Sequence, residues 1–422
     1  MASRDWSFWR ISFWSGTTVV IKVLSSFLTN KLFAVLLGPA GLAMIGQFQN
    51  LVAVGQAIGS GSLHSGWISL TTRLKEQPER LHGFWKAALI MTGCASLLVG
   101  CAALLLSPHL ESLFSSSIGV RAALLLAIPG IWAAQFVIVC QAVTNGLGDM
   151  RRWTIISAIV PILQVIWLLT FLFVNAESAL IALGTQSVLG CFFAGAVVWK
   201  TGFPLRALKR SVKASGYRTL LHYAAMGGVP MLFQPLVLMW IRSSLGKHFG
   251  WEAAGLWQGV WKISDFFSLG LSSVLGIYLL PRISRCTDLH DFRLALRNSI
   301  VWSMGAASVL AGGIWFFRET GIRLILDDTF LSIADSLGPQ LVGDIFRTGA
   351  WCVGISMIAR KQTVLFVVFE ITFQLLFGGG AVLGIRFWGT SAPMASYCLE
   401  NLLCFFIMLL VVWNRPWKPV LV

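Results

Sequence analysis

Charged residues are scarce in this sequence, and their scarcity limits the class of protein it can encode. They make up 12% of the 422 residues, whereas 56% of the residues are hydrophobic and the mean hydropathy is +0.77. An ordinary soluble domain carries roughly 25% charged residues, so that class is excluded. The hydrophobic residues come in runs of about 20 separated by short polar breaks, the length of a helix that crosses a bilayer. The sequence therefore predicts an all-α polytopic membrane protein with about twelve transmembrane helices.

Signals of other classes are missing as well. The ten-residue alternating segments of an outer-membrane barrel do not occur. The eight cysteines include no CxxC pair and no metal-ligand spacing, and no glycine-rich phosphate-binding loop is present. The first apolar run is long and lacks a small-residue cleavage site. We therefore expect no metal, no other cofactor and no ATP-driven step, and we expect the first run to anchor the chain in the membrane.

Acidic residues are few, with 17 Asp and Glu against 32 Lys and Arg, and the net charge is +15. In a soluble protein this excess would suggest nucleic acid, but here the placement of the basic residues decides its meaning. When successive breaks are assigned to alternate sides of the membrane, 22 basic residues fall on one side, five on the other and five within the spans. Basic loops stay in the cytoplasm. Both termini are therefore predicted to be cytoplasmic, and no nucleic-acid partner is expected.

The longest basic break, residues 200–218, lies near the midpoint of the chain. Six spans are predicted on each side of it. Transporters are commonly built from two such repeats with the binding site between them. We therefore expect an N-terminal lobe at 1–199, a cytoplasmic linker at 200–218 and a C-terminal lobe at 219–422.

Charged side chains inside the spans are the main functional signal. In the apolar segment Gly255 to Arg285, Gln258, Lys262 and Asp265 share one helix face. Two charges facing lipid would cost about 5 to 7 kcal/mol at the bilayer centre, so the stripe must face protein or water. Two interpretations are open: the pair lines a functional cavity, or it neutralises itself and only holds helices together.

Similar residues lie in other spans. Gln340, Asp344 and Arg347 repeat the spacing of the first stripe with the charge order reversed. Glu370 has no basic partner in its own helix. The remaining ionisable residues within spans are Lys22, Lys31, Arg242 and Glu400. Lys22 falls on the polar face of the first helix, whereas Lys31 lies nearer the outer end, where it either faces inward or reaches the interface.

Five cations thus accompany four acids in the spans, which predicts a balanced or slightly cationic interior. Lys and Arg in such an interior suit a pyrophosphate or an acidic sugar, because they offer charge and several donors. A cationic substrate would instead favour an interior with a net negative charge.

Four local motifs resemble a known family: GPAGL at 38–42, GLWQGV with ISD at 255–265, YLLPRISR at 278–285 and QLVGD at 340–344. They resemble the Wzx-type flippases of the MOP superfamily, in particular the translocases of the enterobacterial common antigen and O-antigen repeat units. The resemblance implies two six-helix lobes related by a pseudo-two-fold axis along the membrane normal. It also implies ion-coupled alternating access in the bacterial inner membrane. The implied substrate is an undecaprenyl-pyrophosphate-linked oligosaccharide of surface-polysaccharide synthesis, and the implied partners are bilayer lipids and the polymerase and chain-length regulator of that pathway.

The residues within the spans then receive expected roles. We expect the head group and pyrophosphate to be bound by Lys22, Lys31, Arg242, Lys262, Arg347 and Gln258. We expect ion coupling to involve Asp265, Asp344 and Glu370, because ionising an acid would occupy a cation that the substrate needs.

Two alternatives remain. One is a MATE-like exporter of small molecules, which the charge balance favours less. The other is a membrane polysaccharide polymerase, an enzyme that would need a sizeable outer loop. The longest outer break is about 318–338 and carries no nucleophile, metal ligands or paired carboxylates. We therefore expect a transporter with no catalytic residues.

Overall fold

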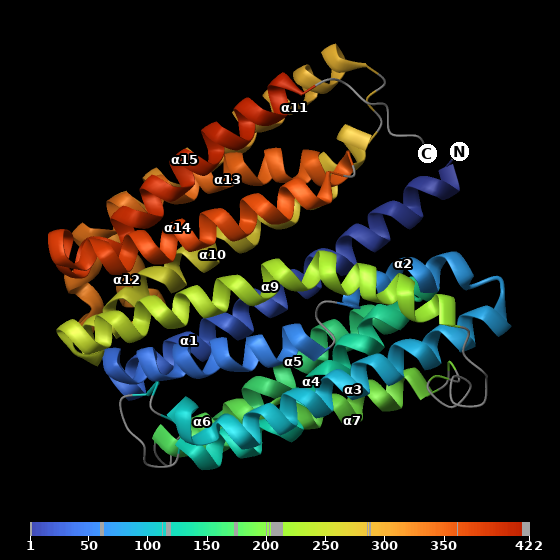
Figure 1. Ribbon diagram of the computed structural model, residues 1–422, viewed down its shortest axis with the longest axis horizontal. Helices are drawn as coiled ribbons and strands as arrows, with labels where there is room; N and C mark the ends of the chain where they lie inside the picture. Colours follow the sequence, from blue (N-terminus) through green and yellow to red (C-terminus); the bar gives the residue numbers. More distant parts are fainter. Residues whose placement is uncertain are drawn as a thin grey trace. The chain divides into compact units, whose positions relative to one another are not determined.

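The computed structural model describes residues 2–59, 63–111, 113–114, 120–172, 176–199, 201, 203, 214–284, 286, 288–360 and 362–415. Regular structure in these residues is helical throughout (Figure 1). The first half of the chain contributes α1 (Ala2–Gly59), α2 (His64–Leu74), α3 (Pro78–Glu111), α4 (Val120–Leu147), α5 (Met150–Leu172), α6 (Ala176–Thr185) and α7 (Ser187–Trp199). The second half contributes α9 (Ala214–Phe249), α10 (Trp251–Ser284), α11 (Leu289–Phe316), α12 (Arg318–Ile325), η2 (Asp328–Ser336), α13 (Leu337–Ala359), α14 (Thr363–Trp388), η3 (Gly389–Ser391) and α15 (Ala392–Asn414).

The lengths of these helices account for the twelve predicted spans. Eight segments of the described chain are long and apolar enough to cross a membrane. Two of them, Gly16–Gly59 and Val364–Asn414, have 44 and 51 residues, about twice the 20 needed for one crossing. Each is interrupted at a glycine with positive φ, Gly38 (65°) or Gly389 (56°). With α9 and α10, which have 36 and 34 residues, the prediction of an all-α protein of about twelve spans is confirmed.

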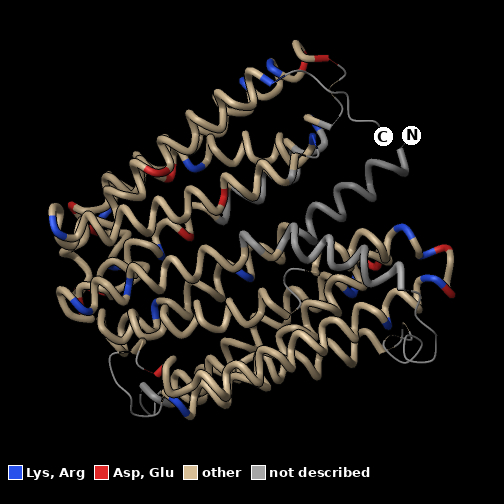
Figure 2. The backbone as a smooth tube through the Cα atoms, viewed as in Figure 1, with Lys and Arg blue, Asp and Glu red and all other residues tan. Residues whose placement is uncertain are grey.

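Large apolar side chains cover the outside of several helices. Leu105 on α3, Phe192 on α7, Trp302 on α11 and Phe387 on α14 are each between 74% and 83% exposed. Such a surface is not stable in water, and it matches the hydrocarbon of a bilayer. Lys and Arg gather toward helix ends and loops, with few along the helices (Figure 2).

The chain divides into two compact units. Unit 1 comprises Met1–Thr29 and Gln47–Leu236, and unit 2 comprises Asn30–Gly46 and Val237–Val422. The segments 30–46 of α1 and 237–249 of α9 therefore pack with unit 2, while the rest of both helices packs with unit 1. The linker expected at 200–218 falls largely outside the described residues, and the lobe boundaries set around it stay a prediction.

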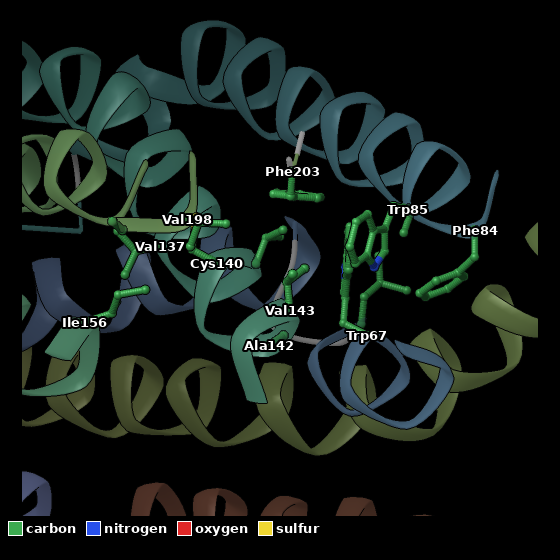
Figure 3. Packing of buried hydrophobic residues seen from close by; sticks show 14 of the residues in the cluster. Trp67, Phe84, Trp85, Val137, Cys140, Ala142, Val143, Ile156, Val198 and Phe203 are labelled. Carbon is green, nitrogen blue, oxygen red and sulfur yellow. The ribbon is translucent and has the colours of Figure 1, made fainter. Parts of the chain in front are cut away.

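In unit 1, α4 is the central helix and contacts α2, α3, α5, α6 and α7. It is apolar on all sides, which is the pattern of a buried helix. At one end of the core, Phe203 packs edge-on against Trp67 and Trp85, with ring centroids 6.1 and 5.2 Å apart (Figure 3). The Trp85 indole donates a hydrogen bond to Thr71 at 3.2 Å. This aromatic group joins α2, α3 and the segment after α7.

In unit 2, α13 has the central place and contacts α10, α11, α14 and α15. These helices lie side by side in Figure 1. Buried residues from α10, α11, α13, α14 and α15 form one apolar core, which includes Leu279, Phe292, Val353, Phe373 and Phe405. Several polar residues of α10 and α13 form the site described below.

One membrane span, Ser178–Trp199, contains a short interruption. The helix is broken at Gln186, a single turn residue that separates α6 from α7. The hydroxyl groups on both sides of the interruption accept hydrogen bonds from side chains of α5. The Trp167 indole donates to Thr185 at 3.0 Å, and the Gln164 amide donates to Ser187 at 3.3 Å. These contacts between helices explain why a continuous apolar pattern did not give a continuous helix.

Candidate substrate and coupling site

Two of the motifs singled out in the sequence meet in unit 2. At Gly255 a methyl group would lie 1.7 Å from the Pro39 carbonyl oxygen, so the backbone of α10 touches that of α1 just after the kink at Gly38. One helical turn further on, the Gln258 side chain lies directly against Gly46. Close approach of this kind is possible only where one residue has no side chain. The GPAGL and GLWQGV motifs therefore form one packing interface.

Gln258 in turn binds Arg242, which comes from α9. The Arg242 side chain is fully buried, and both Nε and Nη2 donate to the Gln258 amide oxygen, Nε at 3.2 Å. The guanidinium also lies 5.8 Å from the centre of the Trp257 ring. A buried charge needs such compensation, because desolvation without partners costs several kcal/mol.

The buried carboxylate of Asp344 is the centre of a hydrogen-bond network. Ser264 from α10 donates to Oδ2 at 2.6 Å, and Tyr397 from α15 donates to Oδ1 at 2.7 Å. Each hydroxyl also accepts one hydrogen bond, Ser264 from Gln340 at 2.8 Å and Tyr397 from Arg347 at 3.1 Å. Both carboxylate oxygens thus accept, and every hydroxyl hydrogen points toward Asp344. This arrangement fits the ionised form of Asp344.

Glycine in the QLVGD motif makes room for this network. A methyl group at Gly343 would lie 2.5 Å from the Tyr397 ring. Tyr397 can therefore lie over α13 and reach the neighbouring Asp344. The motif combines an amide that binds Ser264, a glycine that admits Tyr397, and the carboxylate itself.

Arg347 is held in an aromatic environment. Its guanidinium carbon lies 4.9 Å from the ring centre of Trp351 and 6.0 Å from those of Trp261 and Tyr397. Phe377 stacks on Trp261 with ring centres 5.9 Å apart and an interplanar angle of 17°. Arginine suits such a site because its planar, weakly hydrated guanidinium stacks on rings and keeps its charge.

The other charges of α10 lie near this centre. Asp265 accepts a hydrogen bond from the Trp261 side chain and interacts electrostatically with Lys262, Arg347 and Arg242. Asp265 and Lys262 are both partly buried. The stripe predicted on α10 therefore faces other charged groups of unit 2.

Glu370 and Glu400 form a second acidic group. Glu370 on α14 is hydrogen-bonded to Gln374 and interacts with Arg347. Glu400 on α15 interacts with both Arg347 and Glu370. Glu370 has no basic partner on its own helix, and the cation with which it interacts electrostatically is Arg347 of α13.

The two lysines of α1 belong to different units. Lys31, in unit 2, donates to the carbonyl oxygens of Arg323 and Leu326 at 2.6 and 2.5 Å, at the C-terminal end of α12. Carbonyls at a helix end favour a cation. Lys22, in unit 1, is exposed and interacts electrostatically with His64 of α2.

The charge balance of this site differs from the balanced or slightly cationic interior that was expected for all the spans together. In unit 2, the site combines Arg242, Lys262 and Arg347 with Asp265, Asp344, Glu370 and Glu400. Formally the acids outnumber these cations by one. Among the described residues, no group of three or more His, Cys, Asp or Glu side chains could hold a metal ion.

Three members of this site were not assigned roles from the sequence. Ser264 and Tyr397 carry no charge, and a lone hydroxyl in an apolar run is as often structural as functional. Glu400 was noted as an acid but received no role. Ser264 lies inside the ISD motif, which was a usable signal, whereas nothing in the sequence pairs Tyr397 with Asp344.

No family model matches the chain. The lipid III flippases of Escherichia coli (strain K12) and Shigella flexneri are each 24% identical to it over 415 residues, which is 96% of the chain and 99% of each relative. An inward-facing multidrug resistance MATE family transporter of the MOP superfamily has a TM-score of 0.74 at 14% identity, covering 93% of the chain and 97% of that protein. A MOP superfamily transporter from Pyrococcus furiosus, whose reversed pocket polarity suggests a different function, has a TM-score of 0.64 at 14% identity, covering 94% and 96%.

The chain therefore has the fold of the MOP superfamily, and it is a multi-span helical membrane protein. The resemblance to flippases of this superfamily, predicted from the four motifs, is confirmed. These relatives are flippases and transporters, in agreement with the prediction that the chain is not an enzyme.

Proposed function

We propose that the chain is a flippase that moves an undecaprenyl-pyrophosphate-linked oligosaccharide from the cytoplasmic to the periplasmic leaflet of the bacterial inner membrane. Both termini lie in the cytoplasm, and an ion gradient drives alternating access. The proposal is supported by the MOP fold, by the likeness to lipid III flippases and by one observation above all. Three of the four motifs that resemble flippase motifs are joined in unit 2: GPAGL packs on GLWQGV, and Ser264 of ISD is hydrogen-bonded to Gln340 and Asp344 of QLVGD.

The pyrophosphate is the part of this substrate that needs cations. We assign its binding to Lys262 and Arg347 of unit 2, with Arg242 and Gln258 as a buried pair in the same unit, and to Lys22 of unit 1. Lys31 is assigned to the outer end of unit 2, because two backbone carbonyls already occupy its ammonium.

Asp344 is the best-placed coupling residue. In its ionised form it accepts from both hydroxyls, and Tyr397 remains an acceptor for Arg347. A proton on Oδ1 of Asp344 would make this oxygen a donor toward Tyr397, and the Tyr397 hydrogen would then have to turn away. Arg347 cannot accept that hydrogen, because it has only donors. Protonation, or a bound cation, thus loosens the link between Tyr397 and Arg347. Asp265 and Glu370 interact with the same arginine and serve the same coupling.

This coupling also explains how a site with more acids than cations can bind a pyrophosphate. With four acids and three cations, the site repels a pyrophosphate when every acid is ionised. Neutralising two acids leaves a net positive site. Ion binding and substrate binding are therefore linked through one centre, as alternating access requires.

The direct test is transport of a fluorescent undecaprenyl-pyrophosphate-linked oligosaccharide in proteoliposomes. An impermeant glycosidase would report which leaflet holds the glycan, with and without an imposed proton or sodium gradient. Gradient-dependent movement of the glycan is expected from the full chain but not from empty liposomes. Equal movement in both preparations would exclude the flippase function.

A MATE-like exporter of small cations is the second candidate, because the four acids of the site in unit 2 outnumber its three cations by one. Uptake of a cationic dye by the same proteoliposomes distinguishes the two. Dye transport without glycan movement would replace the flippase proposal with the exporter.

A further inference from the structure

Unit 1 contains a small cavity that the charged centre of unit 2 does not explain. It has a volume of 160 Å³ and is lined by Phe48, Gln49, Val52, Ala53, Gln56, Leu183 and Gln186. These residues come from α1 after its kink and from the junction of α6 and α7. The space would hold a few water molecules or one sugar ring. Its polar lining consists of three glutamine amides.

Contacts with the neighbouring helices α4 and α5 stabilise the helix break beside this cavity. Two side chains of α5 donate hydrogen bonds to the residues that flank the break: Trp167 donates to Thr185, and Gln164 donates to Ser187. On the α4 side, Gly130 packs so closely that a methyl group there would lie 1.6 Å from the Gly184 carbonyl oxygen. Gln186 lies between these fixed points and lines the cavity. Irregular backbone at membrane depth is tolerated where it is buried in protein or lines a wet cavity, and transporters use such broken helices as binding sites.

Two other glutamines of unit 1 are buried and hydrogen-bonded to neighbouring helices or loops. Gln135 is buried, accepts a hydrogen bond from Ser96 and donates one to the Gly55 carbonyl at 3.4 Å. Gln47 is buried and donates to the Leu113 carbonyl at 3.5 Å. Gln56 and Gln186 differ because they are partly exposed and line the cavity. They are therefore placed to bind a ligand.

Amides are well matched to sugar hydroxyls. Each glutamine amide offers two donors and an acceptor, and each hydroxyl offers one donor and two lone pairs. None of the residues that line the cavity carries a charge, so it does not suit a pyrophosphate. An apolar wall with a few placed polar groups is the usual composition of a small-molecule site.

We propose that this cavity is a sugar-binding subsite in which Gln49, Gln56 and Gln186 bind hydroxyls of a neutral sugar. This inference rests on the proposed flippase function, because it assigns the sugar part of the same substrate to unit 1. The cations then select the pyrophosphate, while the amides select the glycan.

The test compares two ligands on the full chain in nanodiscs: undecaprenyl pyrophosphate, and the same carrier with one N-acetylglucosamine. A neutral hydrogen bond contributes about 0.5 to 1.5 kcal/mol, so two or three should give the glycosylated carrier about a tenfold lower Kd. Gln56→Leu and Gln186→Leu should each reduce this preference at least threefold and leave the Kd of the bare carrier unchanged. Gln141→Leu, on α4 and outside the cavity, is the matched control and should keep the preference.

The outcomes separate the two proposals. If the parent chain binds both carriers equally, or if the variants keep the full preference, the sugar subsite is overturned and the flippase function stands. If the parent chain binds neither carrier, the flippase proposal itself fails. A uniform loss of affinity for both carriers in Gln56→Leu and Gln186→Leu would show that these amides support the fold, and it would also overturn the subsite.

Discussion

At the scale of single residues, Tyr397 is the point where two charges are joined. Its hydroxyl donates to Asp344 and accepts from Arg347. Tyr397→Phe keeps the ring but removes both hydrogen bonds. An unsatisfied buried group costs about 1 to 3 kcal/mol, so we expect a lower melting temperature in detergent and a clear loss of transport at normal protein level.

A double-mutant cycle tests this link without relying on a single variant. If Tyr397 acts through Asp344, Tyr397→Phe and Asp344→Asn should not be additive, because residues in one network share their interaction energy. Additive effects on both melting temperature and transport would show that the two residues act independently.

The second prediction at the scale of single residues concerns Lys22 and Lys262. Replacing either with Ala should abolish glycan export while the protein still reaches the membrane, because the pyrophosphate loses a cation. Arg at either position should restore part of the activity if charge matters more than shape. Full export by both Ala variants would remove the two lysines from the binding site.

At the scale of helices, the contact between α10 and α1 depends on Gly255. A methyl group there would overlap the Pro39 carbonyl, which is backbone and cannot turn away. We expect Gly255→Ala to lower stability by about 1 to 3 kcal/mol or more, as overpacking does. Fluorescence-detected size-exclusion chromatography after heating would measure the effect.

Gly305 on α11 supplies the matched control, since nothing lies within 4 Å of a methyl group at that position. Alanine in a helix interior is favoured over glycine by about 0.5 to 1 kcal/mol. Gly305→Ala should therefore be neutral or slightly stabilising. Equal effects of the two substitutions would show that the α10 contact does not limit stability.

At the scale of the whole molecule, the distribution of charge predicts how transport depends on the gradient. Asp344→Asn, Asp265→Asn and Glu370→Gln each mimic a neutral acid. If these acids couple ion movement to release of the head group, the variants should bind the carrier but lose the response to an imposed gradient. Parent-like gradient dependence in all three would place the coupling elsewhere in the chain.

Local composition was enough to predict the class of the protein and many residues of the candidate site. Run length and hydropathy follow from local composition, so the number of spans could be predicted, and ionisable residues in apolar runs stand out because burying them is costly. Which of these residues meet depends on how the helices pack. Contacts such as Ser264 and Tyr397 with Asp344, Lys31 with the end of α12, and the break at Gln186 join segments far apart in sequence or depend on neighbouring helices. Helical periodicity records only the face on which a residue lies, so it carries no information about its partner on another helix.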